Sequence, residues 1–251
     1  MNDNKYLYRQ FYCEKHGYFE QKGLIRDGEP LWFRCPKCQK EDDEADKREK
    51  LRNEAYSKKV KYQRIFGHWL PKAFNAPLES FEVLDVDMGE AFCDVEEFVR
   101  NFDNNQKEGY GLFLTGRAGT GKTKISCGIL RKLYPGVVGC YVPLYVLGDL
   151  VRQTWDRSKE DIVRYTETEL INAVCETPLL VLDEIGTLDK GRDGKLLFKI
   201  IDARYSNLLP TICISNLSLE GLSNLYGERL GRRIEERNKV IEFNWMPWHK
   251  R

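Results

Sequence analysis

The chain has 251 residues, of which 31% are charged, and its formal net charge is only +1. This balance excludes a uniformly basic surface, so any contact with nucleic acid must come from a local patch. The length allows one full α/β domain and a small accessory module. No run approaches the roughly 18 apolar residues of a membrane-spanning helix, and the N-terminal segment lacks the apolar core of a secretory signal. We therefore expect a cytoplasmic protein that does not contact a membrane.

The cysteines fall into two groups. Three of them lie in Cys13-Glu-Lys-His16 and Cys35-Pro-Lys-Cys38, two pairs separated by 18 residues. Each pair predicts a tight knuckle, and two knuckles close a tetrahedron of ligands around Zn²⁺. Since protein ligands fill all four positions, we expect a structural and not a catalytic site. The remaining five are scattered among apolar segments, which predicts ordinary buried thiols in a reducing compartment: Cys93, Cys127, Cys140, Cys175 and Cys213.

The segment between the two ligand pairs predicts a small β-ribbon. A module of about 40 residues is too small to bury a stable core, so a structural metal is needed. Its charges are mixed, which favours docking to a protein over binding phosphate. The next residues are dense in Lys, Arg, Glu and Asp and predict a solvated helix or tether. We therefore expect a zinc-ribbon docking domain at residues 1–40 and a charged helical linker at 41–69, followed by a larger domain at 70–251, whose motifs are described next.

The run Gly116–Thr123 matches the P-loop pattern G-x-x-x-x-G-K-[ST] at every fixed position. The apolar run 110–115 before it predicts a buried strand, and the apolar spacing of 124–134 predicts a helix whose N-terminus binds phosphate. We expect Lys122 to reach the β- and γ-phosphates of ATP, and the Thr123 hydroxyl to ligate Mg²⁺. The residues expected to hold the nucleotide and its metal are Gly116, Arg117, Ala118, Gly119, Thr120, Gly121, Lys122, Thr123 and Asp183.

Asp183 and Glu184 follow the apolar run Pro178-Leu-Leu-Val-Leu. This pattern predicts a buried parallel strand with Asp183 at its C-terminal end, where α/β sheets bind ligands. Asp183 is expected to hold Mg²⁺, and Glu184 to deprotonate the attacking water. A small-molecule kinase needs no such base, because its substrate is the nucleophile. The pair therefore favours ATP hydrolysis.

Asn216 ends another apolar strand, Thr211–Ser215. If this strand lies beside the one that carries Asp183, the amide of Asn216 can bridge the γ-phosphate and the attacking water. The alternative is that Asn216 caps a helix that begins near Leu219. We favour the catalytic role.

The segment Gly227–Arg233 is rich in arginine. One of these side chains can act as an arginine finger, which stabilises the charge of the transition state at a neighbouring subunit's ATP. Arg229 is our first candidate and Arg232 the second. The alternative is a solvated basic face of a helix.

Taken together, Gly116–Thr123, Leu179–Gly186, Ile214–Leu217, Gly227–Arg232 and Phe243-Asn-Trp245 resemble the DnaC/IstB-type AAA+ ATPases, and among them the loaders of replicative helicases. The resemblance covers roughly residues 70–251. It implies a Rossmann-like AAA+ P-loop core and places Arg229 at the arginine-finger position. Only 35 residues follow Asn216, which predicts that the core lacks a separate helical lid.

The resemblance also implies a function. In this family an N-terminal domain grips a hexameric replicative helicase, and the ATPase domain binds ATP and single-stranded DNA. We therefore expect a loader in a bacterial or phage-infected cell, with self-association through the ATP interface and a weak, partner-stimulated ATPase as release switch. For DNA contacts the candidates are Arg152, Arg157 and Lys159 near Trp155.

Three alternatives remain open. The nearest is an IstB-like helper ATPase of transposition, which shares the core and has a transposase as partner. Another is a zinc-ribbon DNA-binding regulator in which ATP serves only as a conformational lock. A small-molecule P-loop kinase conflicts with Glu184 and Asn216 and has no use for a zinc ribbon.

Overall fold

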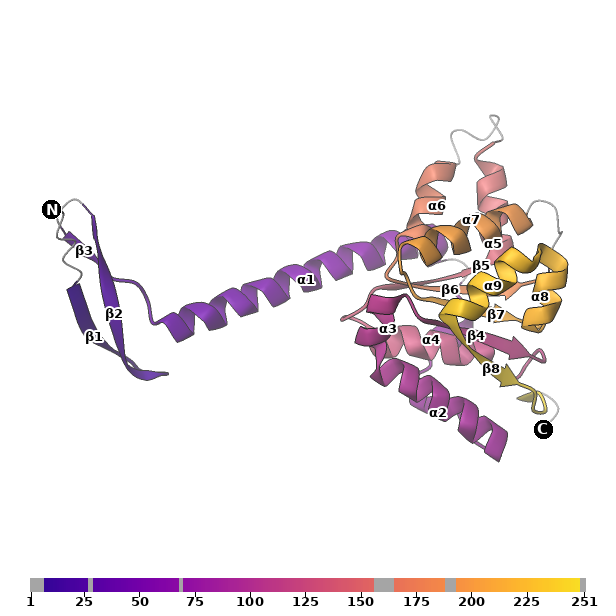
Figure 1. Ribbon diagram of the computed structural model, residues 1–251, viewed down its shortest axis with the longest axis horizontal. Coiled ribbons are helices and arrows are strands. Elements are labelled where there is room, and N and C mark those ends of the chain that lie inside the picture. Colours follow the sequence, from indigo (N-terminus) through magenta and orange to yellow (C-terminus); the bar gives the residue numbers. More distant parts are fainter. Residues whose placement is uncertain (1–6, 27–28, 68–69, 156–164, 188–192, 249–251) are drawn as a thin grey trace. The chain divides into compact units, whose positions relative to one another are not determined.

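The computed structural model describes residues 7–26, 29–67, 70–155, 165–187 and 193–248. The chain divides into two compact units, residues 1–54 and 55–251. Each unit is described by itself (Figure 1).

The first unit is a three-stranded antiparallel ribbon with the order β1-β2-β3. Its strands are β1 (Leu7–Cys13), β2 (Gly17–Arg26) and β3 (Glu29–Leu31). Cys13 pairs with Gly17 in the tight turn between β1 and β2, and Gly17 has a φ of 77°, a left-handed conformation that suits glycine. Strand β1 precedes the first ligand pair, so the ribbon begins earlier in the chain than the sequence pattern indicated.

One face of the ribbon holds a small aromatic cluster. The ring of Phe11 lies 5.7 Å from that of Phe19 and 5.1 Å from that of Trp32, measured between centroids. Successive strand residues point to opposite faces, so Tyr12 and Tyr18 lie on the other face. These two tyrosines are 63% and 79% exposed.

Helix α1 (Pro36–Phe66) begins at the second ligand pair. Its first half is charged and exposed, as a solvated helix requires. Its last turns differ, because Tyr62, Ile65 and Phe66 recur at helical spacing on one face and are buried in the core of the second unit. The charged composition of the helix as a whole concealed this apolar end.

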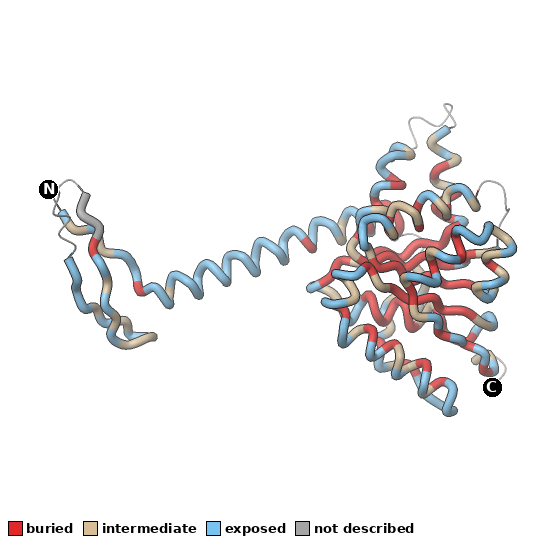
Figure 2. The backbone as a smooth tube through the Cα atoms, viewed as in Figure 1, coloured by how far each residue is buried: buried red, intermediate tan, exposed pale blue. Residues whose placement is uncertain are grey.

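The second unit is built on a parallel sheet with the strand order β5-β6-β7-β4-β8. The strands are β4 (Gly111–Gly116), β5 (Gly139–Pro143), β6 (Leu179–Ile185), β7 (Thr211–Ser215) and β8 (Asn238–Phe243). They form the buried centre of this unit, which Figure 2 shows in red. Strand β4 therefore lies between β7 and β8, and β7 separates it from β6.

Helices cover both faces of this sheet. Phe113 packs on the face covered by α5 (Leu144–Gln153), α6 (Glu167–Cys175), α7 (Asp193–Ser206), α8 (Leu219–Tyr226) and α9 (Glu228–Arg237). Its neighbours Leu112 and Leu114 pack on the opposite face, against α2 (Val86–Arg100), α3 (Phe102–Glu108) and α4 (Lys122–Leu133). Each such buried side chain contributes about 1.5–3 kcal/mol to stability. The predicted Rossmann-like α/β core is confirmed.

The described residues after Asn216 form α8, α9 and β8. Strand β8 pairs with β4 over its whole length, from Asn238 to Phe243. These residues therefore complete the core and do not build a separate helical lid. Among the described helices, none is long and apolar enough to cross a membrane.

The expectation of buried thiols holds for Cys127, Cys140 and Cys213 and is wrong for Cys93, which is exposed. Helix α2 buries Met88, Ala91, Val95 and Phe98, and Cys93 lies outside this stripe. Cys175 is only partly buried.

Candidate functional site

The P-loop connects β4 to α4 through three glycines with positive φ: Gly116 (120°), Gly119 (77°) and Gly121 (101°). A Cβ atom at Gly116 would lie 2.4 Å from the carbonyl oxygen of Phe243, so only glycine fits there. Helix α4 begins at Lys122. The loop therefore leads directly into a helix N-terminus, whose unpaired N–H groups and partial positive charge favour a phosphate.

A cavity of about 370 Å³ lies at this helix N-terminus. Asp183 and Glu184 of β6 reach it, as does Asn216, which follows β7. Its remaining lining comes from residues 118–124 together with Ala73, Ile214, Ser215 and Trp248. The cavity brings together the nucleotide and metal ligands predicted from sequence, except for Gly116 and Arg117 at the start of the loop.

Lys122 has its ammonium group deep in this site. Its Nζ donates to the carbonyl oxygens of Gly116 and Arg117, at 2.8 and 2.7 Å, and to Oδ1 of Asn216, at 3.0 Å. The side chain is only 6% exposed. Burial lowers the pKa of Lys122, while the charges of Asp183 and Glu184 act in the opposite direction. The two carboxylates thus favour the protonated, positively charged form of Lys122, and this charge lies where the P-loop pattern predicts the phosphates.

Asp183 accepts three hydrogen bonds. Its Oδ2 accepts from the hydroxyl of Thr123 and from the phenol of Tyr141, both at 2.8 Å, and its Oδ1 accepts from the N–H of Glu184 at 2.7 Å. Because the Thr123 hydroxyl donates its proton to Asp183, its lone pairs stay available to a cation. A hydroxyl oxygen beside a carboxylate fits Mg²⁺, which prefers oxygen ligands.

Glu184 has a φ of 59°, which is rare for a residue with a side chain. Its side chain is exposed and lines the cavity. Partial loss of water around the carboxyl group is the main cause that raises the pKa of Glu184, and the negative charge of Asp183 is the second. A carboxylate with a raised pKa is a stronger base for a water molecule than an ordinary glutamate. Strained backbone at such a position is common in functional sites.

Asn216 does not cap helix α8. The cap is Ser218, whose Oγ accepts from the N–H of Gly221 at 3.1 Å. The amide of Asn216 lines the cavity and accepts from Lys122. As the sequence predicted, the two strands β6 and β7 lie side by side, which puts Asn216 and Asp183 at the same edge of the sheet.

The sequence analysis assigned no role to three aromatic residues that pack around the P-loop, Phe81, Trp245 and Trp248. The indole Nε1 of Trp245 donates to the carbonyl of Thr120 at 3.0 Å, and the N–H of Trp248 donates to the carbonyl of Gly119 at 3.1 Å. The ring of Phe81 lies T-shaped against Trp248, with centroids 5.9 Å apart. More than 100 residues separate Trp245 from Thr120, so local spacing carries no signal of this contact.

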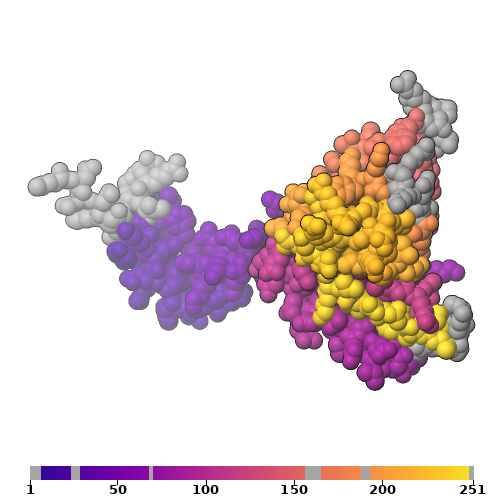
Figure 3. Space-filling view, turned by 45° about the vertical axis from the view of Figure 1, so that its right-hand side comes forward, coloured from indigo at the N-terminus to yellow at the C-terminus, as the bar shows by residue number. Residues whose placement is uncertain are grey.

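Arg229 and Arg232 are exposed on α9 and are absent from the described lining of the cavity. The guanidinium of Arg229 lies 5.0 Å from the centroid of the Phe198 ring, on α7. Helix α9 belongs to the yellow C-terminal surface in Figure 3. The structure therefore brings neither arginine to the nucleotide site of its own chain.

Comparison with known proteins identifies the family. A family model described as IstB-like ATP binding protein matches residues 97–233. The chain belongs to this family. The match includes the P-loop, Asp183, Glu184 and Asn216, and the resemblance inferred from the sequence motifs is thereby confirmed.

Individual members of the family are also similar. The replicative helicase loader DnaC of Escherichia coli K12 is 27% identical over 202 residues, which cover 79% of this chain and 80% of that protein. A crystal structure of the DnaC helicase loader matches with a TM-score of 0.60 and 29% identity, over 68% of this chain and 99% of that one.

More distant structures share the fold alone. A DnaI crystal structure has a TM-score of 0.58 and 24% identity, over 69% of this chain and 94% of that one. The DnaA protein of Aquifex aeolicus bound to AMPPCP has a TM-score of 0.54 and 22% identity, over 69% of this chain and 51% of that one. The second unit thus shares its fold with the DnaC, DnaI and DnaA structures.

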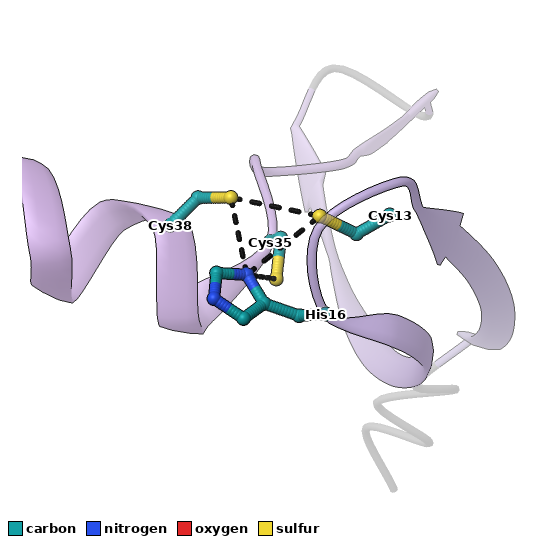
Figure 4. A group of neighbouring side chains, drawn as sticks. All are labelled: Cys13, His16, Cys35 and Cys38. Atoms are coloured by element: carbon teal, nitrogen blue, oxygen red, sulfur yellow. Dashed lines mark hydrogen bonds between the residues drawn. The ribbon is translucent and has the colours of Figure 1, made fainter.

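The four predicted zinc ligands, which lie outside the matched region, converge in the first unit (Figure 4). The Sγ atoms of Cys13 and Cys38 are 3.5 Å apart, and Nδ1 of His16 lies 3.3 Å from Sγ of Cys38 and 3.7 Å from those of Cys13 and Cys35. A tetrahedral Zn²⁺ with ordinary Zn–S and Zn–N bonds has ligand separations of about 3.5–3.8 Å. The donor set therefore fits one zinc ion.

The electrostatics of the first knuckle suit a metal ligand. The backbone N–H groups of Lys15 and His16 lower the pKa of the Cys13 thiol to about 6. His16 turns Nδ1 toward the three sulfur atoms, while its Nε2 lies 3.0 Å from Oε1 of Glu41. This tautomer, with the proton on Nε2, leaves the lone pair of Nδ1 for a metal. Sequence spacing did not reveal Glu41, because acidic residues are common in the charged helix.

Proposed function

We propose that the protein is an ATP-dependent loader of a replicative DNA helicase onto single-stranded DNA. One observation carries this proposal: the P-loop, two carboxylates and an amide surround one cavity of the second unit, in a chain that is 29% identical to a solved structure of the DnaC helicase loader, over 99% of the chain in that structure. ATP binding and hydrolysis then serve as the switch that releases the helicase.

In this proposal the P-loop N–H groups and Lys122 bind the phosphates of ATP. Thr123 and Asp183 would hold Mg²⁺, which neutralises charge on the phosphates. Asn216 orients the attacking water, and Glu184 accepts its proton. The raised pKa of Glu184 supports this role, because a base works best when its pKa is close to the working pH.

Hydrolysis is expected to be weak in the isolated chain. Arg229 and Arg232 are exposed and lie away from their own cavity, which supports a role at the ATP of a neighbouring copy. Arg229 stays the first candidate. Self-association through the ATP interface would then complete each site and stimulate turnover.

The zinc-bearing unit is proposed to dock on the helicase. Tyr8, Tyr12 and Tyr18 share the face of the ribbon that its own aromatic cluster leaves exposed. Exposed tyrosines are typical anchors of protein interfaces. The exposed charged half of α1 lies between this ribbon and the turns that pack in the second unit, which supports the division into docking domain, linker and ATPase domain.

Single-stranded DNA is proposed to contact the end of α5. Trp155 is exposed there and offers a surface on which a base can stack. The nearby Arg152 is engaged by Asp149 and Asp193. Arg157 and Lys159 lie outside the described residues.

The proposal is tested by mixing the full chain with hexameric replicative helicases and measuring complex formation by light scattering, with ATP and with ADP. The variant Cys35→Ser removes a zinc ligand, and Cys93→Ser changes an exposed thiol outside the cluster as a control. We expect a complex that Cys35→Ser abolishes and Cys93→Ser leaves intact. No complex in any nucleotide state would refute the loader.

The family match itself supports a second candidate, because its description is IstB-like. In that case the partner is a transposase, and the chain acts as a helper ATPase of transposition. Binding to a transposase, combined with no binding to any helicase, would replace the first proposal with this one.

A further inference from the structure

We propose that Tyr141 is a positioning residue of the magnesium site, whose hydroxyl fixes the carboxylate of Asp183. This inference rests on the proposed ATPase function. It concerns a residue in β5, a strand that contains no recognised nucleotide motif. The phenol of Tyr141 donates to Oδ2 of Asp183 at 2.8 Å, and the hydroxyl of Thr123 donates to the same oxygen at the same distance.

The sheet register puts Tyr141 in this position. Strands β5 and β6 are parallel neighbours, and Tyr141 is paired with Val181. Alternate residues of a strand share a face, so Tyr141, Val181 and Asp183 all point to the side that α4 covers. Tyr141 and Val181 belong to the same buried cluster as Ile125 and Cys127 of α4. The ring is thus held between sheet and helix, and its hydroxyl reaches the end of β6.

The hydroxyl of Tyr141 is suited to donate to Asp183 at all times, whether or not a metal is bound. A tyrosine hydroxyl keeps its proton at physiological pH, because its ordinary pKa is about 10, and here the carboxylate oxygen Oδ2 of Asp183 accepts a hydrogen bond from this hydroxyl. Asp183 is only 3% exposed, and the nearby Cys127 has its pKa raised to about 12 by burial. In such poorly hydrated surroundings a hydrogen bond to a carboxylate is strong and directional.

The two hydroxyl groups that donate to Oδ2 of Asp183 are expected to respond differently when a metal binds. Thr123 is proposed to direct its lone pairs to Mg²⁺, so both the metal and Asp183 would determine the orientation of its hydroxyl group. Tyr141 lines no part of the described phosphate cavity and has Asp183 as its hydrogen-bond acceptor. It can therefore hold the carboxylate in one orientation both before and after the metal binds. Groups that orient a metal ligand in this way typically change metal affinity by about 10–100-fold.

The variant Tyr141→Phe keeps the buried ring and removes the hydroxyl. The affinity for a fluorescent ATP analogue is measured in a titration with Mg²⁺ and again with excess EDTA. We expect the Mg²⁺ concentration for half-maximal effect to rise by about 10–100-fold, while the affinity in EDTA stays at the wild-type value. Tyr205→Phe, which removes a phenol that donates to Glu236 at the surface, is the matched control.

A double-mutant cycle with Asp183→Asn separates positioning from packing. In the Asp183→Asn background, Tyr141→Phe should no longer change the Mg²⁺ dependence. An equal loss of affinity with and without Mg²⁺ would assign Tyr141 a purely structural role and overturn the inference, as would an unchanged Mg²⁺ titration. If the wild-type chain itself binds no nucleotide in Mg²⁺, the ATPase proposal fails instead, so the two failures are distinguishable.

Discussion

The ammonium group of Lys122 lies 3.0 Å from Oδ1 of Asn216, which connects the first residue of α4 to the residue that follows β7. The same Nζ atom donates to two carbonyls of the P-loop. In this state Lys122 donates its hydrogen bonds to protein oxygens, which a γ-phosphate would replace as acceptors. The contact holds Asn216 at the cavity, where we propose that its amide meets the phosphate and the attacking water.

Glu184→Gln is expected to separate ATP binding from hydrolysis. The amide cannot accept the proton of water, so the hydrolysis rate should fall by at least about 100-fold. Lys122, Thr123 and Asp183 are untouched, so the affinity for ATP should stay unchanged. Phosphate release and binding of a fluorescent ATP analogue measure the two quantities. A variant that still hydrolyses ATP at the wild-type rate would show that the base is another group.

The substitution Glu184→Gln is also expected to change how the thermal stability of the fold depends on pH. Folding raises the pKa of Glu184 above its ordinary value of 4.5, so the fold favours the protonated form. The ionised form therefore destabilises the fold near neutral pH, and this destabilisation disappears as the pH falls below the unfolded-state pKa. Glu184→Gln should raise the thermal midpoint near neutral pH, and the difference should shrink toward pH 4.5.

A matched control for this pH series is Glu235→Gln, at an exposed glutamate of α9. Its thermal midpoint should follow that of the wild type at every pH. A gain for Glu184→Gln that is independent of pH would mean that charge plays no part in it.

Removal of zinc should unfold the first unit and spare the second. Among the described side chains of the ribbon, the apolar packing is a small aromatic cluster around Phe11. We therefore expect most of the folding free energy of this unit to come from the metal, about 10 kcal/mol or more in small zinc modules. After treatment with a chelator, limited proteolysis should degrade the residues before α1 rapidly. Nucleotide affinity should remain. Loss of nucleotide binding together with the ribbon would show that the two units depend on each other for folding.

Glu41→Gln should weaken zinc binding without removing a ligand. The carboxylate of Glu41 accepts from Nε2 of His16 and pairs with Lys15, so it fixes the tautomer that presents Nδ1 to the metal. Competition with a chromophoric chelator should show a loss of zinc affinity of about 10–100-fold. Glu44→Gln, on an exposed glutamate one turn further along α1, is the control. Equal affinities of the two variants would contradict this role of Glu41.

The sequence predicted the elements that carry short, fixed motifs. The P-loop, the strand that carries Asp183 and the four candidate zinc ligands depend on spacing within a few residues, and the structure brings each of these together as the spacing predicts. The second ligand pair differs from the prediction in one respect, because it lies at the beginning of helix α1 and not in a separate knuckle. The neighbouring position of β6 and β7 was also predicted, because parallel strands that end in polar residues commonly meet at the ligand-binding edge.

Contacts between distant segments were not predictable. Tyr141 lies in a five-residue strand, Gly139–Pro143, whose sequence has no apolar alternation, and its contact with Asp183 exists only because β5 pairs with β6. Trp245 reaches Thr120 because β8 returns to the sheet beside β4. The buried end of α1 was hidden for the same reason, since the partners of Tyr62 and Phe66 lie far away in the chain.

Arg204 of α7 is expected to be the most sensitive polar position in the core. It is 1% exposed, and its guanidinium donates to the carbonyls of Val174, Thr177 and Pro210 and to the hydroxyl of Thr211. Arg204 therefore joins the end of α6 to the segments that lead into β6 and β7. Arg204→Met keeps much of the volume but leaves these buried oxygens without a donor.

The expected loss in the free energy of unfolding is about 3–5 kcal/mol, measured by chemical denaturation. Arg100→Met, at an exposed arginine near the end of α2, should change it by no more than about 0.5 kcal/mol. Arg204 contacts the segments that precede β6 and β7, whereas the nucleotide cavity lies at the C-terminal ends of these strands. A folded Arg204→Met chain should therefore keep its affinity for ATP. A loss of stability no greater than that of the control would mean that water replaces the guanidinium at these oxygens.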